Sequence, residues 1–171
     1  NKDAKEIYQL IIEEGKNHNL SHCGSHAMDT MRMESGFLHW GHDISPEENQ
    51  YEAGLNFVIS YKKEIDFIGK ESLLKIKDQK QNRRFIMLSL KNSKSGTPLL
   101  LHEEPIYLED KIIGRTTSGN YSFNYKKNLS FGYVSSAHSN EELSKMDLYI
   151  EVAKQKFPAV VEITPLKDKH V

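Results

Sequence analysis

The chain has 171 residues, with 23 lysines and arginines against 24 aspartates and glutamates, and a formal net charge of −1. This length allows one domain or two small ones with a buried core. The balanced charge excludes the strong basic excess of nucleic-acid-binding proteins, and we expect the short basic run Arg83-Arg84 to lie on a solvated face. No apolar stretch approaches the roughly 20 residues that span a bilayer. We therefore expect neither a nucleic-acid partner nor a membrane partner.

The single cysteine, Cys23, excludes an internal disulfide framework and suits a reducing compartment, the cytoplasm or a mitochondrial matrix. The polar start of the chain does not resemble a signal peptide. The first residue is Asn1 rather than methionine. We therefore expect that a longer chain has lost an upstream part.

The first third of the chain predicts two helices. The run from Asp3 to Glu6 has the pattern of a capping box, and Gly15 is a plausible end for the helix that it opens. The apolar face of this helix would consist of Ile7, Leu10 and Ile11. A second helix is predicted over Ser25–Glu34 and ends before Gly36.

The next stretch predicts a strand and then a helix. Gly54–Tyr61 is rich in β-branched and aromatic residues, which favours a strand. Ile68–Lys77 predicts a third short helix. A polar linker, Asp78–Asn82, then ends the helical part of the chain.

After the linker the pattern changes to short runs of alternating or β-branched residues. Turn signals separate these runs, at residues 95–98, 109–111 and 118–120. Six strands are predicted, at Arg84–Leu90, Ile106–Leu108, Ile112–Thr117, Leu129–Val134, Leu148–Val152 and Ala159–Ile163. Strands at this spacing favour a small antiparallel barrel or sandwich. The predicted fold class is therefore α+β: a mixed α/β segment, residues 1–80, followed by an antiparallel β-barrel of about six strands, residues 81–171.

Two positions stand out as candidate binding residues. Arg32 lies between two methionines in a helix; it either covers the surface and pairs with Asp29 or serves a ligand. Trp40 precedes Gly41-His42-Asp43 and is either a core aromatic beside a turn or a stacking wall for a flat ring. His42 and Asp43 are adjacent and would point to opposite sides of an extended segment, so we do not expect a dyad.

The sequence contains no motif for dinucleotide or phosphate binding, for a serine nucleophile or for a metal site. The sequence contains no GxGxxG, GxSxG or P-loop pattern. Four histidines lie near Cys23, but without HExxH or CxxC spacing, so we expect no metal site.

Several segments together carry a resemblance to a known family. They are GSHAMDTMRMESGFLHWGHD from Gly24, YEAGLNFVI from Tyr51, DFIGKESL from Asp66 and GRTTSGNYSF from Gly114. The chain resembles the folate-dependent aminomethyltransferases, typified by the T-protein of the glycine cleavage system. Within this family it is most similar to the C-terminal part of dimethylglycine and sarcosine dehydrogenases.

The resemblance implies tetrahydrofolate as cofactor and a small amine as the other substrate. It implies folate-site roles for Arg32, Glu34 and Trp40, although Glu34 also suits a local cap or pair. The family's catalytic aspartate would lie outside this chain, so no catalytic residue is assigned. A preceding part would bind FAD if the dehydrogenase similarity holds. We expect the missing N-terminal half, or the second subunit of a homodimer, to cover the exposed apolar surface of residues 1–80.

Two alternatives remain at this stage. One is a non-catalytic folate-binding or regulatory protein of the same architecture. The other, which the surroundings of Cys23 disfavour, is a folate-binding iron–sulfur assembly protein. We expect the chain alone to be catalytically inactive.

Overall fold

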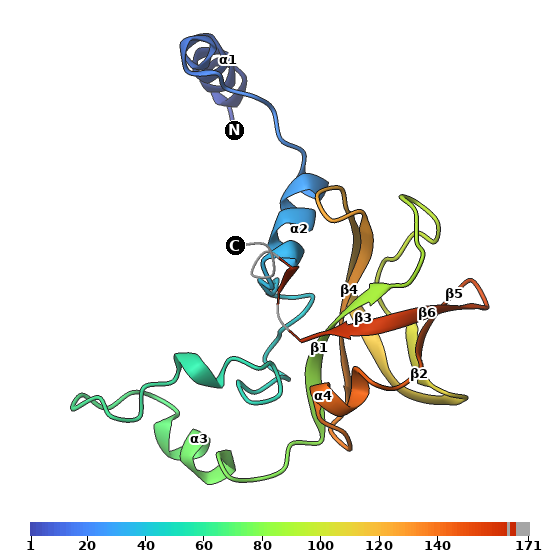
Figure 1. The fold of residues 1–171 in the computed structure, drawn as a ribbon. Helices are drawn as coiled ribbons and strands as arrows, with labels where there is room; N and C mark the ends of the chain where they lie inside the picture. The colour runs from blue at the N-terminus through green and yellow to red at the C-terminus, as the bar shows by residue number, and fades with distance from the viewer. Residues whose placement is uncertain (164, 167–171) are drawn as a thin grey trace.

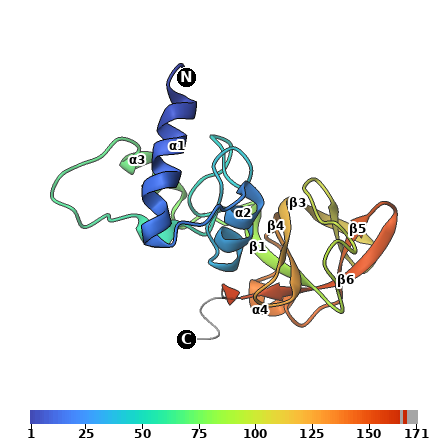
Figure 2. The ribbon, with the colours of Figure 1, turned by 90° about the horizontal axis from the view of Figure 1, so that it is seen from above.

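The computed structural model describes residues 1–163, 165 and 166 and has a helical segment followed by a closed barrel (Figure 1). The segment's helical elements are α1 (Ala4–Gly15), η1 (Lys16–His18), α2 (Ser25–Glu34), η2 (Asn56–Val58) and α3 (Lys70–Ile76). Long turns connect them. Helix α1 lies away from the barrel, whereas α2 packs against it (Figures 1 and 2).

The barrel is antiparallel, and its strands close in the order β1-β4-β3-β2-β5-β6. The strands are β1 (Arg83–Leu90), β2 (Pro105–Leu108), β3 (Lys111–Ser122), β4 (Lys127–Ser135), β5 (Leu148–Val152) and β6 (Gln155–Glu162). One helical turn, α4 (Asn140–Leu143), bridges β4 and β5 and begins with a capping box at Ser139. The strands bury their alternate apolar side chains inside the barrel, with Leu88, Ile106 and Ile150 fully buried, whereas Phe131 is buried on the outer face against Met33 of α2.

The predicted fold class is confirmed: a helical segment precedes a closed six-stranded antiparallel barrel. The second helix begins and ends where predicted, at Ser25 and Glu34. All six predicted strands are present, with longer bounds for most of them. The division into units 1–80 and 81–171 stays a prediction, and residues 164 and 167–171 of the second unit lie outside the described part.

Two local predictions are wrong. Gly54–Tyr61 is not a strand; Gly54, with φ +71°, ends a turn, and η2 follows it. Residues 118–120 are not a turn but the interior of β3. A Cβ at Gly119 would lie 2.6 Å from the Cβ of Leu100, so this glycine permits close packing rather than a bend.

The predicted bounds of the first helix are confirmed, but its predicted capping box is not. Asp3 is the N-cap residue, but its side chain makes no capping hydrogen bond. The apolar residues Ile7, Leu10 and Ile11 are 54–60% exposed. They lie at helical spacing on one face of α1, and this face is exposed to solvent.

Candidate functional site

Arg32 anchors helix α2 to the barrel through several hydrogen bonds. Its Nε donates to Asp29 at 2.8 Å, Nη1 donates to Asp43 at 2.7 Å, and Nη2 donates to Ser118 in β3 at 2.9 Å. Nη1 also donates to the backbone carbonyl of Phe37. The guanidinium carbon lies 5.7 Å from the ring centre of Phe131. Arg32 therefore pairs with Asp29 as the simple interpretation predicts, but it also holds the helix, the following loop and the barrel together.

Asp43 is the acceptor at the centre of this network, and its side chain is fully buried. One carboxylate oxygen accepts from Arg32 and from the backbone N–H of His39; the other accepts from Thr117 and Ser118, at 2.6 and 2.8 Å. A buried charge is stable only when paired and fully hydrogen-bonded, which these donors achieve.

Glu34 makes a second buried connection between α2 and the barrel. One oxygen accepts from the Ser122 hydroxyl at 2.5 Å, and the other accepts from the Asn124 amide at 2.9 Å. The side chain is 6% exposed and faces the end of β3. Its two oxygens are thus engaged within the protein.

Replacing Glu34 with glutamine will lower the free energy of unfolding by about 1–3 kcal/mol, because a charge-assisted acceptor is lost and the new amide faces the Asn124 amide. Urea denaturation measures this loss. We expect the affinity for folate to stay unchanged, since no oxygen of Glu34 is directed to a ligand. A large loss of folate affinity at unchanged stability would contradict this assignment.

Trp40 is 66% exposed in the turn that follows α2. The interpretation as a core aromatic is therefore wrong. The turn itself is fixed, because the Gly41 N–H donates to the Ile44 carbonyl at 2.7 Å and Gly41 has φ +88°. The indole is presented to solvent on a rigid turn.

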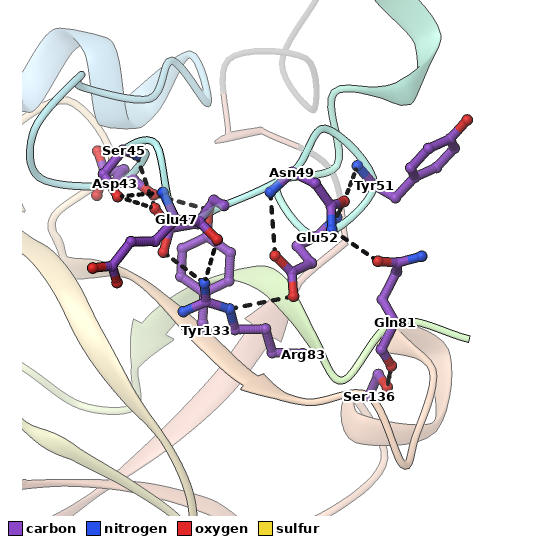
Figure 3. Close-up of polar contacts among 11 residues, drawn as sticks. Asp43, Ser45, Glu47, Asn49, Tyr51, Glu52, Gln81, Arg83, Tyr133 and Ser136 are labelled. Atoms are coloured by element: carbon purple, nitrogen blue, oxygen red, sulfur yellow. Dashed lines mark hydrogen bonds and ion pairs between the residues drawn. The ribbon is translucent and has the colours of Figure 1, made fainter. Parts of the chain in front are cut away.

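Arg83, at the start of β1, attaches the loop of residues 45–52 to the barrel (Figure 3). Its guanidinium lies 2.9 Å from the Glu48 carboxylate and 3.4 Å from the Glu52 carboxylate, and it donates to the Glu47 carbonyl. It also stacks 5.3 Å above the ring of Tyr133. The interpretation of Arg83 as a solvated surface residue is therefore wrong.

Tyr133 connects the two networks. Its hydroxyl donates to the backbone carbonyl of Asp43 at 2.8 Å, and the residue is 6% exposed. Burial, assisted by the charge of Glu48 and opposed by Arg83, raises the pKa of Tyr133 above its ordinary value of 10.0.

This raised pKa makes stability depend on pH in the alkaline range. The unfolded phenol ionises near pH 10 while the folded one stays protonated, so the folded state binds more protons and stability falls as pH rises above 10. The stabilising contribution is complete below pH 10. We expect Tyr133→Phe to lose this decline, together with a hydrogen bond of about 0.5–1.5 kcal/mol. Denaturant titrations of both proteins from pH 8 to 11 measure it; parallel curves above pH 10 would contradict it.

A cavity of about 670 Å³ lies between the helical segment and the barrel, and we call it the segment–barrel cavity. Its lining is mainly apolar and includes four aromatic rings, from Phe37, Phe57, Phe85 and Phe131. The polar side chains in its lining come from Ser35, Asn140 and Glu162. Phe57 is 78% exposed, so its ring is free to contact a ligand. A larger open cleft, of about 760 Å³, is lined only by residues between Gln50 and Leu73 and does not touch the barrel.

A smaller cavity of about 390 Å³ adjoins the same face of the barrel. Its lining includes Arg84 and Asn140. Within the described residues, the Nε of Arg84 and the Oδ1 of Asn140 are buried without a hydrogen-bond partner. An unsatisfied buried guanidinium N–H favours an anionic or carbonyl ligand at this position.

The predicted site residues thus lie in different surroundings. Arg32 touches two residues of the cavity wall, Glu34 lies between α2 and the end of β3, and Trp40 is not among the lining residues of the cavity. Sequence reasoning missed Asp43, Ser118, Arg83 and Arg84. The Asp43–Ser118 contact joins residues 75 positions apart, and no local pattern reveals such a pair.

Two family descriptions match the chain. The GCVT N-terminal domain matches residues 1–63, and the glycine cleavage T-protein C-terminal barrel domain matches residues 83–168. The chain belongs to the glycine cleavage T-protein family.

Individual relatives agree with this membership. The chain is 32% identical over 167 residues to human mitochondrial dimethylglycine dehydrogenase, covering 96% of this chain and 18% of that protein. It is 33% identical over 138 residues to the aminomethyltransferase of Symbiobacterium thermophilum, covering 81% and 36%. It is 32% identical over 165 residues to the formaldehyde-forming 4-methylaminobutanoate oxidase of Paenarthrobacter nicotinovorans, covering 96% and 19%.

Among solved structures, the glycine cleavage system aminomethyltransferase T of Bartonella henselae matches with a TM-score of 0.70 and 21% identity. The match covers 82% of this chain and 38% of that one, and it shows a shared fold. The chain therefore spans between about a fifth and two fifths of these relatives. Among the described residues, none of the helices combines the length and the apolar character that a membrane span needs. The same residues contain no group of three or more side chains in a metal-binding arrangement.

Proposed function

We propose that this chain is the folate-binding C-terminal part of a longer aminomethyltransferase-type enzyme, which passes a one-carbon unit from a methylated glycine to tetrahydrofolate. The parent protein we propose is of the dimethylglycine or sarcosine dehydrogenase type, with FAD in its preceding part. The family membership and the extended match to dimethylglycine dehydrogenase support this proposal. Tetrahydrofolate binding is a general property of the family.

The segment–barrel cavity is the observation that carries the proposal. Its volume lies in the range of small-ligand sites, and its apolar walls with few polar groups suit a flat ring system. The exposed ring of Phe57 and the wall ring of Phe37 are available to stack against the pterin or the aminobenzoyl ring. The guanidinium group of Arg84, a residue that lines the adjoining smaller cavity, is a chemically suitable partner for a carboxylate of the glutamyl tail.

The three residues to which the resemblance assigns folate-site roles then have different roles in this proposal. Arg32 fixes the wall through the Phe37 carbonyl and the Phe131 ring. Trp40 does not line the cavity, but it offers an exposed ring at the turn after α2, where it stacks on the part of the ligand that extends out of the cavity. Glu34 holds α2 in place.

Replacing Trp40 with alanine will raise the dissociation constant for tetrahydrofolate about 3–10-fold, because one aromatic stacking contact of about 0.5–1.5 kcal/mol is lost. Trp40→Phe serves as the matched control and should retain most of the affinity. Isothermal titration calorimetry in a reducing buffer measures both. Equal affinity of Trp40→Ala and the wild-type chain would remove Trp40 from the site.

A non-catalytic folate-binding protein is the alternative. Two observations favour it. Glu162 is the single ionisable side chain among the described residues that line the cavity. Its carboxylate accepts hydrogen bonds from Ser89 and Lys127. An acid held in this way is poorly placed as a free general base.

The experiment is a pair of assays on the 171-residue chain. Calorimetry should show saturable binding of tetrahydrofolate with one site. A second assay follows 5,10-methylenetetrahydrofolate formation from tetrahydrofolate with formaldehyde or a methylamine donor, and it should give only the uncatalysed rate. Absence of binding would overturn the proposed function, and a rate above background would show that the chemistry resides in this chain.

A further inference from the structure

Asp43 makes polar contacts with three different elements of the fold: α2, β3 and β4. Its carboxylate accepts from Arg32 of α2 and from Thr117 and Ser118 of β3, and its carbonyl accepts from Tyr133 of β4. The residue is 1% exposed and does not line the segment–barrel cavity. Its position therefore depends on the barrel and on α2 together.

The first set of these contacts continues to one wall of the cavity. Arg32, held by Asp43, donates to the Phe37 carbonyl and lies over the Phe131 ring, and both phenylalanines line the cavity. Ile44, the neighbour of Asp43 in sequence, lines it as well. Movement of the Asp43 carboxylate would therefore shift three residues of this wall.

The second set continues to the part of the cavity lining that comes from the start of β1 and from residues 53–55. Tyr133 donates to the Asp43 carbonyl, and its ring lies beneath the guanidinium of Arg83 (Figure 3). Arg83 in turn pairs with Glu48 and Glu52 in the loop of residues 45–52. The Glu52 carbonyl accepts from the backbone N–H of Phe85 at 2.7 Å. Phe85 and the residues directly after Glu52 line the cavity.

We infer that Asp43 is a positioning residue for the ligand of the segment–barrel cavity. It holds the lining residues that come from the turn after α2, from residues 53–55 and from the barrel in their places without touching the ligand itself. This inference rests on the proposed function and adds to it the residue that couples α2, the loop and the barrel.

Asp43→Asn is the most selective test. The asparagine retains the size of the side chain and one oxygen for Thr117 and Ser118. It places an amide donor opposite Arg32 and the His39 N–H, so these two contacts are lost. Asp29→Asn is the matched control, because Asp29 is the other carboxylate bound to Arg32 and its side chain is 38% exposed on the solvent side.

The measurement is the dissociation constant for tetrahydrofolate, at a temperature where circular dichroism shows each variant to be folded. We expect Asp43→Asn to weaken binding at least tenfold and Asp29→Asn to leave it within twofold. If Asp43→Asn does not fold, Thr117→Val combined with Ser118→Ala detaches the same carboxylate from β3 and keeps its pair with Arg32. The same tenfold loss is expected of this double variant.

The outcomes separate the two ideas. If the folded Asp43→Asn variant, or the folded double variant in its place, binds tetrahydrofolate as tightly as the wild-type chain, Asp43 has a purely structural role. That result overturns the inference and leaves the proposed function standing. A lower melting temperature with an unchanged dissociation constant has the same meaning. No binding by the wild-type chain overturns the proposed function and this inference with it.

Discussion

Replacing Arg32 with alanine will lower the free energy of unfolding by about 3–5 kcal/mol, the typical cost of removing one partner of a buried ion pair. The Asp43 carboxylate would be left buried with its charge uncompensated. The Phe37 carbonyl and the Ser118 hydroxyl would also each lose a donor. This stability effect exceeds the roughly 1.5–3 kcal/mol expected for one lost charge-assisted contact to folate.

Two further variants show whether the buried pair is the cause. Asp29→Ala removes only the exposed partner of Arg32, so it should cost less than about 1 kcal/mol. Arg32→Ala combined with Asp43→Asn should cost less than the sum of the single changes, because the uncompensated charge is then absent. Chemical denaturation measures the wild-type chain, the single variants Arg32→Ala, Asp43→Asn and Asp29→Ala, and the double variant. Additive costs, or a loss below about 1 kcal/mol for Arg32→Ala, would show that the pair contributes little.

Replacing Gly114 with alanine will destabilise the barrel by about 3 kcal/mol, at the upper end for overpacking. A Cβ at this position would overlap the carbonyl oxygen of Tyr133 and lie 2.8 Å from the Cα of Val134. These are backbone atoms of β4, paired with β3 at this register, and they cannot rotate away. The strand would have to shift, and Tyr133 would move with it.

Gly24→Ala is the matched control. Gly24 precedes α2 with φ −76°, and no atom lies within 4 Å of the position that an added methyl group would take. The change should cost less than about 1 kcal/mol, since alanine is a poorer N-cap than glycine but lowers the conformational entropy of the unfolded chain. Similar losses for Gly114→Ala and Gly24→Ala would contradict the close approach of β3 and β4.

The elements of the fold are predictable where the signal is local. Helix α2 and the strands of the barrel follow from periodicity and turn residues, which depend on near neighbours in sequence. Gly119 resembles a turn residue because the segment packed against it, near Leu100, cannot be seen in the sequence. Among the residues that the structure describes, no strand pairs with the β-branched run after Gly54, so its propensity does not produce a strand.

The candidate site is predictable only in part. The position of Arg32 between two methionines indicates a residue with special partners. Its partner Ser118 is 86 positions away, and the pairing arises only when α2 packs on β3. Arg83 is indistinguishable in sequence from a surface arginine, because its partners Glu48 and Glu52 lie in an irregular loop. Tertiary contacts of this kind require the folded chain.

The most direct test of the central claim, that the segment–barrel cavity binds tetrahydrofolate, is an isotope-filtered nuclear Overhauser experiment on the labelled chain with unlabelled ligand. We expect cross-peaks between the aromatic protons of the ligand and the rings of Phe37 and Phe57, which both line the cavity. Cross-peaks confined to the separate cleft around Ile65 and Ile68, or saturating ligand without any cross-peak to a cavity residue, would contradict the account.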